Sequence, residues 1–159
     1  MTDAVTSLRV YTGASATTES AAQTGIDLVS VDNALNSPAN RSNFKVAPGA
    51  NSFEKIVAVK LDTVNGRALS GFWVERTGDT PDGVVIKMGV SDTGSTPTAS
   101  VSVIATTTMV AGRRYIFDAN TYDTTGQKTR YLYLQEQTQI SATSGAIETQ
   151  SIEVGWSQS

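Results

Sequence analysis

The sequence contains no cysteine and no histidine among its 159 residues. Without cysteine no disulfide can stabilise the fold, so its stability must come from packing. Without histidine the chain lacks the commonest general base and metal ligand. The two absences together exclude zinc sites built from Cys or His, and catalysis by a Ser-His-Asp triad within this chain. We therefore expect a protein that is not an enzyme, with no catalytic residue, no cofactor and no metal site.

Charged residues are also scarce. They make up 17% of the chain, below the usual ~25% of a soluble domain, and the net charge is −3. A nucleic-acid partner would require a clustered basic face, so we expect none. No apolar run approaches the ~20 residues of a membrane-spanning helix, and we expect no membrane contact. Residues 1–6 show neither the basic region nor the apolar region of a secretion signal.

What the chain does have is β-compatible sequence: Ser and Thr make up about a quarter of it, and apolar and polar residues alternate in many short segments. This alternation is the period of a β-strand, and Gly/Pro-containing turns separate the segments. No segment has a sustained helical period, and helix is limited to one possible turn at residues 32–35. We predict an all-β, antiparallel β-sandwich of eight or nine strands, for which a jelly roll fits equally well. The predicted strands are residues 7–12, 26–31, 53–61, 69–76, 84–90, 100–109, 114–118, 129–138 and 151–157.

The most apolar stretch is residues 53–76. It predicts two strands, residues 53–61 and 69–76, joined as a hairpin by a turn at Asn65-Gly66. Apolar residues at both odd and even positions predict a place at the centre of a packed sheet. Aromatic residues in strands are more often core than surface, so we expect Trp73 and Trp156 in the core.

The N-terminal residues predict a second unit. Residues 1–25 contain a short strand and a Ser/Thr/Ala-rich flexible linker, and residues 26–159 form the sandwich domain. A strand so short is not stable alone, so it must pair with a sheet edge of its own body or of a neighbour. We predict that this arm clamps the protein to an adjacent subunit or particle, with Leu8, Val10 and Tyr11 at the contact.

Residues 129–138 predict a strand with two different faces. If Leu132 and Leu134 face the core, Tyr131 and Tyr133 stand side by side on the other face. Adjacent exposed tyrosines are suited to a protein–protein contact, and we predict one here. A second covered face is an equal alternative.

In the strand predicted at residues 100–109, alternation predicts that Val101, Val103 and Ala105 point inward.

Two groups of carboxylates have a conceivable chemistry. Residues 118–123 partly match the start of a calcium loop, but Tyr122 and Asp123 stand where an oxygen ligand and the glycine belong, so we interpret them as a β-turn. Glycoside hydrolysis requires two carboxyl groups at a defined separation in a cleft. The carboxylates considered for that role lie in ordinary turn contexts, and we interpret them as solvated: Glu75, Asp79, Asp82 and Asp92.

The chain resembles, in style, the small all-β virion structural proteins of tailed bacteriophages. The resemblance rests on a short N-terminal strand on a Ser/Thr/Ala arm, a Ser/Thr-rich β-body without Cys or His, and the ending Ile-Glu-Val-Gly-Trp-Ser-Gln-Ser. It is similar to capsid decoration or cement proteins, and less closely to tail or baseplate accessory proteins. It implies a non-enzymatic virion component, assembled in the host cytoplasm, that binds and stabilises a lattice of major capsid protein, often as a trimer.

The alternative from another class is a carbohydrate-binding, receptor-binding module. It requires two or three exposed aromatic side chains on one face. A small hydrolase ranks last, because the chain lacks a nucleophile–base pair.

Overall fold

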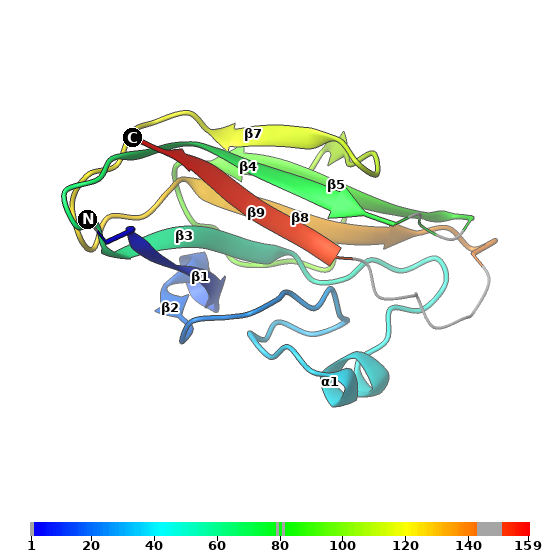
Figure 1. Ribbon diagram of the computed structural model, residues 1–159. Coiled ribbons are helices and arrows are strands. Elements are labelled where there is room, and N and C mark those ends of the chain that lie inside the picture. Colours follow the sequence, from blue (N-terminus) through cyan, green and yellow to red (C-terminus); the bar gives the residue numbers. More distant parts are fainter. Residues whose placement is uncertain (1, 79, 81, 143–150) are drawn as a thin grey trace.

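The computed structural model describes residues 2–78, 80, 82–142 and 151–159, and nine strands in this part of the chain form two sheets packed as a sandwich (Figure 1). The strands in chain order are β1 (Val5–Thr12), β2 (Thr18–Glu19), β3 (Lys55–Thr63), β4 (Leu69–Thr77), β5 (Val84–Ser91), β6 (Thr107–Thr108), β7 (Arg114–Asp118), β8 (Tyr131–Thr138) and β9 (Ser151–Gln158). The larger sheet has the order β2-β1-β3-β8-β5-β6, and the smaller has the order β7-β4-β9.

The prediction of an all-β antiparallel sandwich is confirmed. Neighbouring strands in both sheets are antiparallel. Helix within the described residues is confined to α1 (Pro38–Asn43) and the 3-10 turn η1 (Ala14–Ala16). No helix in these residues is long and apolar enough to cross a membrane.

The main core lies between the two sheets, where alternate residues of each strand point inward. The inward faces of β3 and β4 pack against each other at its centre. Burial of their side chains supplies the main driving force for folding. The residues concerned are Val57, Val59, Leu61, Leu69, Phe72 and Val74, each at most 2% exposed.

The outer face of the larger sheet is also covered, by connections of the same chain. Ala16 of η1 and Ala105 belong to a second buried cluster on this face. Gly89 in β5 has no room for a side chain, because a Cβ there would lie 1.8 Å from the carbonyl oxygen of Ile104. The coverage of both faces predicted for residues 53–61 is thereby confirmed.

The hairpin predicted from residues 53–61 and 69–76 is wrong, although both strands exist. β3 pairs with β1 and β8, whereas β4 pairs with β7 and β9. Asn65 and Gly66 do form a turn, with φ of 51° and 74°, but it carries the chain from the larger sheet to the smaller. Two strands with apolar inward faces bury more surface by packing face to face than by pairing edge to edge.

The strand predicted at residues 100–109 is reduced to the two residues of β6. Val101 and Val103, predicted to point inward, are 66% and 88% exposed, and Ser102 between them is buried. The Ser102 hydroxyl accepts hydrogen bonds from the backbone N–H groups two and three residues ahead, at 3.1 and 2.7 Å. Local hydrogen bonds of this kind compete with strand pairing, which explains why alternation here gave no strand.

The helical turn lies later in the chain than predicted, at α1 rather than at residues 32–35. Ser37 is its N-cap: the hydroxyl oxygen accepts a hydrogen bond from the Asn40 N–H at 3.1 Å. Pro38 follows in the first turn, where its missing N–H has no cost. This Ser-Pro pair is the sequence signal that marks the helix start.

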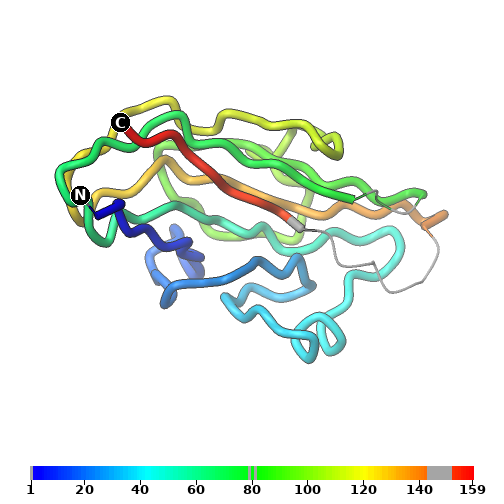
Figure 2. The backbone as a smooth tube through the Cα atoms, in the orientation of Figure 1, coloured from blue at the N-terminus to red at the C-terminus, as the bar shows by residue number. Residues whose placement is uncertain are grey.

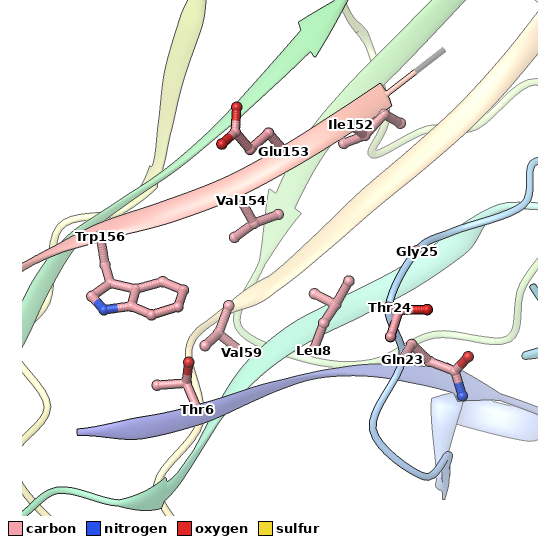
Figure 3. A pocket seen from close by; sticks show the side chains of 10 residues that line it. All are labelled: Thr6, Leu8, Gln23, Thr24, Gly25, Val59, Ile152, Glu153, Val154 and Trp156. Atoms are coloured by element: carbon pink, nitrogen blue, oxygen red, sulfur yellow. The ribbon is translucent and has the colours of Figure 1, made fainter. Parts of the chain in front are cut away.

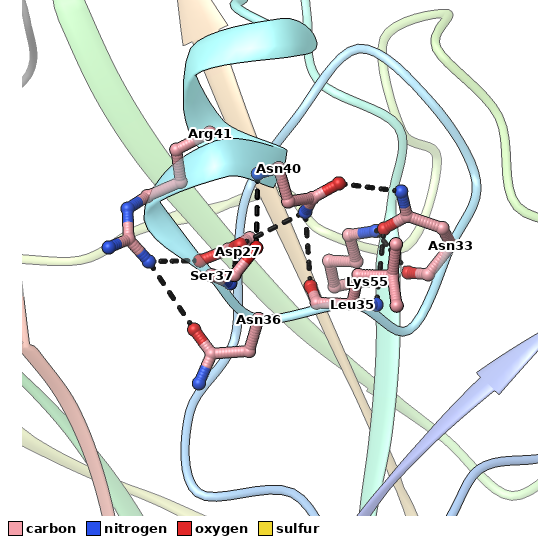
Figure 4. A network of polar contacts seen from close by, with 8 residues as sticks. All are labelled: Asp27, Asn33, Leu35, Asn36, Ser37, Asn40, Arg41 and Lys55. Atoms are coloured by element: carbon pink, nitrogen blue, oxygen red, sulfur yellow. Dashed lines mark hydrogen bonds and ion pairs between the residues drawn. The ribbon is translucent and has the colours of Figure 1, made fainter.

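Residues 26–31, predicted as the first strand of the body, form no strand, and the Asp27 side chain among them is the centre of a network of polar contacts (Figure 4). Asp27 is 3% exposed and accepts three hydrogen bonds. Its donors are the backbone N–H of Ser37 at 2.9 Å and the side chains of Asn40 at 2.9 Å and Arg41 at 2.7 Å. These bonds outweigh the effect of burial and lower the pKa of Asp27.

β1 is a full member of the larger sheet and pairs with β3 of the same chain. Residues 13–25, predicted as a flexible linker, fold back along β1. The Ser20 N–H donates to the carbonyl oxygen of Val10 at 2.9 Å, and the Gln23 N–H donates to that of Leu8 at 2.9 Å. The arm predicted at residues 1–25 is therefore part of the larger sheet and not a separate unit. Its strand pairs within the chain, in place of the predicted clamp to a neighbour.

Trp73 is not the core residue that its neighbours predicted. Phe72 points inward and is 0% exposed, while Trp73 lies on the outer face of the smaller sheet, with the guanidinium carbon of Arg114 4.0 Å from its ring centroid. A Cβ on Gly155 would lie 2.2 Å from the indole, so glycine there makes room for the ring. Trp156 does pack, partly buried, against the core.

Both termini lie at the same end of the sandwich (Figure 2). At this end the Gln158 side chain donates to Asp3 Oδ1 at 3.2 Å, and the Asn65 side chain donates to the Asp3 carbonyl oxygen at 2.7 Å. β1 begins here and β9 ends here. The two strands therefore run in opposite directions along one side of the molecule, in different sheets.

Candidate functional site

A groove of about 290 Å³ opens between β1 and β9 (Figure 3). One wall is formed by Leu8, and Val59 of β3 lies beside it. The other wall is formed by Val154 and Trp156, and the figure shows these side chains pointing toward the first two. The polar lining comes from Thr6 and from residues 23–25. The groove is therefore mostly apolar in its depth, as binding sites for uncharged or chain-like partners are.

Few side chains of the groove carry acid–base chemistry. Glu153 is the one titratable side chain among the residues that line it, and Figure 3 shows its carboxylate on the opposite side of β9 from Val154 and Trp156. No nucleophile–base pair is present among the lining residues. Within the described ranges, no group of three or more acidic residues is placed to hold a metal ion.

The two strands that border the groove differ in the state of their edges. The outer edge of β1 is occupied by Ser20, Gln23 and β2, as described above. β9 pairs with β4 on one side only, within the part of the chain that the structure describes. The groove thus combines an apolar interior with an unpaired strand edge, which is the arrangement that binds extended protein segments.

Three of the residues predicted for partner binding lie in β1, and the structure separates them. Leu8 lines the groove, Val10 is 2% exposed in the main core, and Tyr11 is 3% exposed on the opposite face of the sheet. The Tyr11 hydroxyl donates to Glu19 at 2.9 Å, and burial, together with this hydrogen bond, raises the pKa of Tyr11. Only Leu8 of the three is placed to touch a partner.

The predicted tyrosine pair is covered, which was the alternative interpretation of residues 129–138. Tyr133 is 0% exposed, and its hydroxyl accepts a hydrogen bond from the Ser95 N–H at 2.9 Å and donates to the Thr93 carbonyl oxygen at 3.0 Å. Tyr131 is half-buried against Tyr11, with ring centroids 5.1 Å apart. Tyr133 therefore attaches the loop that crosses the outer face, Tyr131 packs on Tyr11, and the two do not form an exposed contact surface.

Lys128 completes this aromatic cluster. Its ammonium nitrogen lies 4.6 Å from the ring centroids of both Tyr11 and Tyr131, and it donates to the Tyr131 hydroxyl at 2.6 Å. Cation–π contacts of this kind stabilise the outer face. The cluster accounts for the tyrosines by packing alone.

Neither group of carboxylates forms the site that its chemistry would require. Asp118 is 1% exposed, and its carboxylate accepts hydrogen bonds from Asn120, Tyr122 and Arg130. These donors make it the centre of a turn. Burial and the bond to Asp118 raise the pKa of Tyr122 to about 12.

Of the carboxylates considered for glycoside hydrolysis, two are held in ion pairs. Glu75 pairs with Arg114 at 2.9 Å, and Asp92 pairs with Arg130 at 2.6 Å. Asp82 is exposed in a turn, and Asp79 lies outside the described residues. The structure brings no two of the described ones together in a cleft.

Two further buried ionisable groups outside the groove have strongly shifted pKa values. Glu136 of β8 is 4% exposed, and its Oε1 has no hydrogen-bond partner; burial raises the pKa of Glu136 to about 7. Lys55 is 2% exposed, and its ammonium group donates to the backbone carbonyl oxygens of Val31 and Asn33. Burial lowers the pKa of Lys55 to about 8, an effect that nearby Asp32 and Asp27 partly offset.

The sequence contained part of the signal for this groove. In residues 151–157, Ile152, Val154 and Trp156 alternate with polar residues or glycine, and all three pack against the core. The same segment has one charged residue, Glu153, and neither Lys nor Pro, which is the composition of an unprotected edge. What sequence reasoning missed is that this strand is an edge, since strand order is not encoded locally.

No protein-family model, curated protein or solved structure matches this chain. A function must therefore be argued from the geometry of the molecule. The groove beside β9 and the exposed apolar side chains are the features that support one.

Proposed function

We propose that this protein is a non-enzymatic structural protein of a phage virion, of the capsid decoration or cement type, which binds the capsid lattice and stabilises it. The observation that carries the proposal is the open side of the sandwich, where an apolar groove runs beside the unpaired edge of β9. An unpaired edge binds protein main chain, and a groove beside it receives alternate side chains. The partner that fits this site is another protein, here the major capsid protein.

The exposed apolar surface supports a protein partner as well. The large apolar side chains that are exposed are all aliphatic, with Val103 at 88%, Val101 at 66% and Ile116 at 61% among them. Ser102 is buried and holds its two valine neighbours outward, since its N–H donates to Gln135 at 3.0 Å and its hydroxyl accepts two backbone bonds. Apolar groups held outward on a fixed backbone are typical of contact surfaces, because ordering them on binding costs little entropy.

The carbohydrate-binding alternative gains no support from the aromatic residues. All eleven of them lie in the described part of the chain, and none is exposed. Trp73 on the outer face of the smaller sheet is stacked with Arg114. A sugar would have to displace this guanidinium before it could contact the indole.

The experiment that tests the proposal is co-sedimentation with phage capsids that have been emptied of DNA and stripped of decoration protein. We expect saturable binding and a higher capsid melting temperature, and capsids that keep their own decoration protein are the control. Saturable binding to isolated tails or baseplates instead would assign the protein to the tail. Binding to none of these particles would contradict the proposal. Sedimentation equilibrium of the free protein measures whether it forms the trimer that the resemblance implies.

A further inference from the structure

The strands at the sheet edges differ in how they are protected against pairing. β2 and β6 have two residues each, and β7 has five. β9 has eight, with Glu153 as its only charged residue and without Lys or Pro. Proteins usually shorten, charge or cover an edge strand, because a long bare edge pairs with other chains. Within the described residues, β9 is the longest strand at a sheet edge, and its protection is limited to the single charge of Glu153.

The groove beside this edge is bounded on both sides. β9 forms one border, and β1 with residues 23–25 forms the other. The backbone of β1 is already bonded there, since the Gln23 N–H donates to the Leu8 carbonyl oxygen. An incoming chain can therefore pair with β9 only. The groove therefore offers a partner one open strand edge, which suits a single extended segment.

The side chains along β9 indicate the pattern of that segment. Ile152, Val154 and Trp156 point into the groove and are only partly buried. In an added strand, the residues next to these also point into the groove, where they contact Leu8 and Val59. The segment must therefore be apolar at alternate positions.

The outer face of the smaller sheet indicates the charge of the segment. Arg114 of β7, Glu75 of β4 and Glu153 of β9 stand in one row across the three strands, because Glu75 lies opposite both of the others. Arg114 forms an ion pair with Glu75 at 2.9 Å. Glu153 has no ion pair or hydrogen bond within the described part of the chain. A basic residue in the next strand of the sheet would complete this row.

We propose that the groove between β1 and β9 binds one extended segment of a partner protein, which adds to β9 as the fourth strand of the smaller sheet. This segment has apolar side chains at alternate positions and a Lys or Arg opposite Glu153. The inference rests on the proposed function in one respect, namely that the segment belongs to the capsid protein. The bare edge, the bounded groove and the unpaired carboxylate support it independently of that source.

A synthetic peptide tests the groove without any particle. The peptide has the length of β9, alternates valine with threonine and carries one central lysine. We expect it to slow amide hydrogen exchange in β9 by about tenfold or more, because strand addition protects edge amides. Exchange in β7, the other edge of the same sheet, should not change. Unchanged exchange in β9 at millimolar peptide would overturn the proposal.

Tryptophan fluorescence gives a second measurement, because one of the two tryptophans lines the groove. In a Trp73→Phe variant, Trp156 is the only tryptophan, and it lines the groove. Peptide binding should shift its emission to shorter wavelength, since an occupant excludes water from the indole. Slower exchange in β9 without this shift would place the peptide on the edge but outside the groove, contrary to the proposal.

A charge exchange tests the partner of Glu153. A peptide with a central glutamate in place of lysine should bind the native protein about fivefold more weakly or worse, and the order should reverse for the Glu153→Lys variant. The exposed carboxylate of Asp123 is the control, because Asp123→Lys should leave the native order unchanged. Equal affinities of both peptides for both proteins would overturn the assignment of a basic residue.

Emptied capsids separate this inference from the proposed function. Capsid binding with slowed exchange in β9 supports both. Capsid binding with unchanged exchange in β9 overturns the inference and leaves the decoration function standing. Without capsid binding the decoration function fails, and the peptide result alone decides whether the groove accepts a strand.

Discussion

The two long sides of the sandwich lie between the same sheets but are built differently. On the closed side the chain crosses directly from β6 to β7. Met109 in that crossing is 1% exposed, and its carbonyl oxygen accepts a hydrogen bond from Arg76 at 3.1 Å. The Gly112 N–H in turn donates to the Arg76 carbonyl oxygen at 2.8 Å. This side is sealed by the chain's own backbone.

On the open side no described hydrogen bond joins β1 to residues 152–157 of β9, and the groove lies between them. β1 and β9 come from distant parts of the sequence, and no short connection among the described residues crosses the gap. The difference teaches that chain connectivity decides which side of a sandwich is closed. The side without a connection keeps apolar surface that a partner can cover.

The largest expected effect concerns the core that both sides share. Phe72 contacts Phe117 of β7 and Trp156 of β9, with ring centroids 6.3 and 6.2 Å apart. We expect Phe72→Ala to lower the free energy of unfolding by about 3–5 kcal/mol, because it leaves a cavity between the sheets. Urea denaturation measures this loss. Trp73→Ala is the matched control on the outer face, and an equal or greater loss for that variant would contradict the assignment of Phe72 to the core.

The second prediction compares the two sides directly. Met109→Ala on the closed side should cost about 2–5 kcal/mol, because the residue is fully enclosed. Val154→Ala on the open side should cost about 1 kcal/mol, since its side chain is only partly buried. Thermal denaturation of both variants checks the difference. Similar losses would mean that the open side is closed in solution, for example by a second copy, which sedimentation at several concentrations would reveal.

The third prediction compares a carboxylate in the interior with one at the open edge. The pKa of Glu136 is raised from 4.5 to about 7 in the folded protein. Between these values the carboxyl group stays protonated in the folded state but loses its proton in the unfolded state. The free energy of unfolding therefore falls as the pH rises from 4.5 to 7. The reduction is on the order of 3 kcal/mol. Glu136→Gln should abolish it.

The measurement is urea denaturation at a series of pH values for the native protein, for Glu136→Gln and for Glu153→Gln. Glu153→Gln is the control, because it makes the same exchange of a carboxyl group for an amide on an exposed side chain. A Glu136→Gln curve parallel to the native one would show that the carboxyl group is not held in the dry interior that the structure describes.

The smallest expected effect concerns the open edge itself. Glu153 stands opposite Glu75, and like charges in this position repel weakly. Glu153→Lys should therefore raise stability slightly, by about 0.2–1 kcal/mol, as measured by thermal denaturation at low salt. The gain should shrink at high salt because exposed charges are screened. A large loss of stability would show that Glu153 has a structural partner, and the proposed charge match with a bound strand would then be wrong.

The sequence by itself determined which segments become strands wherever alternation met no competing local bonds. Ile86 and Met88 share a buried face of β5, and Leu132 and Leu134 share one of β8, as alternation predicts. The turn at Asn65-Gly66 lies where its composition predicts. Period and turn chemistry are local properties, so a single sequence can show them. The interior of the groove belongs here too, since Ile152, Val154 and Trp156 alternate with polar residues or glycine in the sequence.

Only the tertiary structure decided which strands pair, which faces are covered and which edge stays open. Tyr133 is buried because a loop some forty residues earlier binds its hydroxyl. Val103 is exposed because Gln135, far along the chain, holds the backbone of neighbouring Ser102. β9 is an edge because β4 is its one described neighbour, and β4 lies more than seventy residues before it in the chain. Such contacts join segments that are remote in sequence, and no local pattern of residues specifies which remote segments will meet.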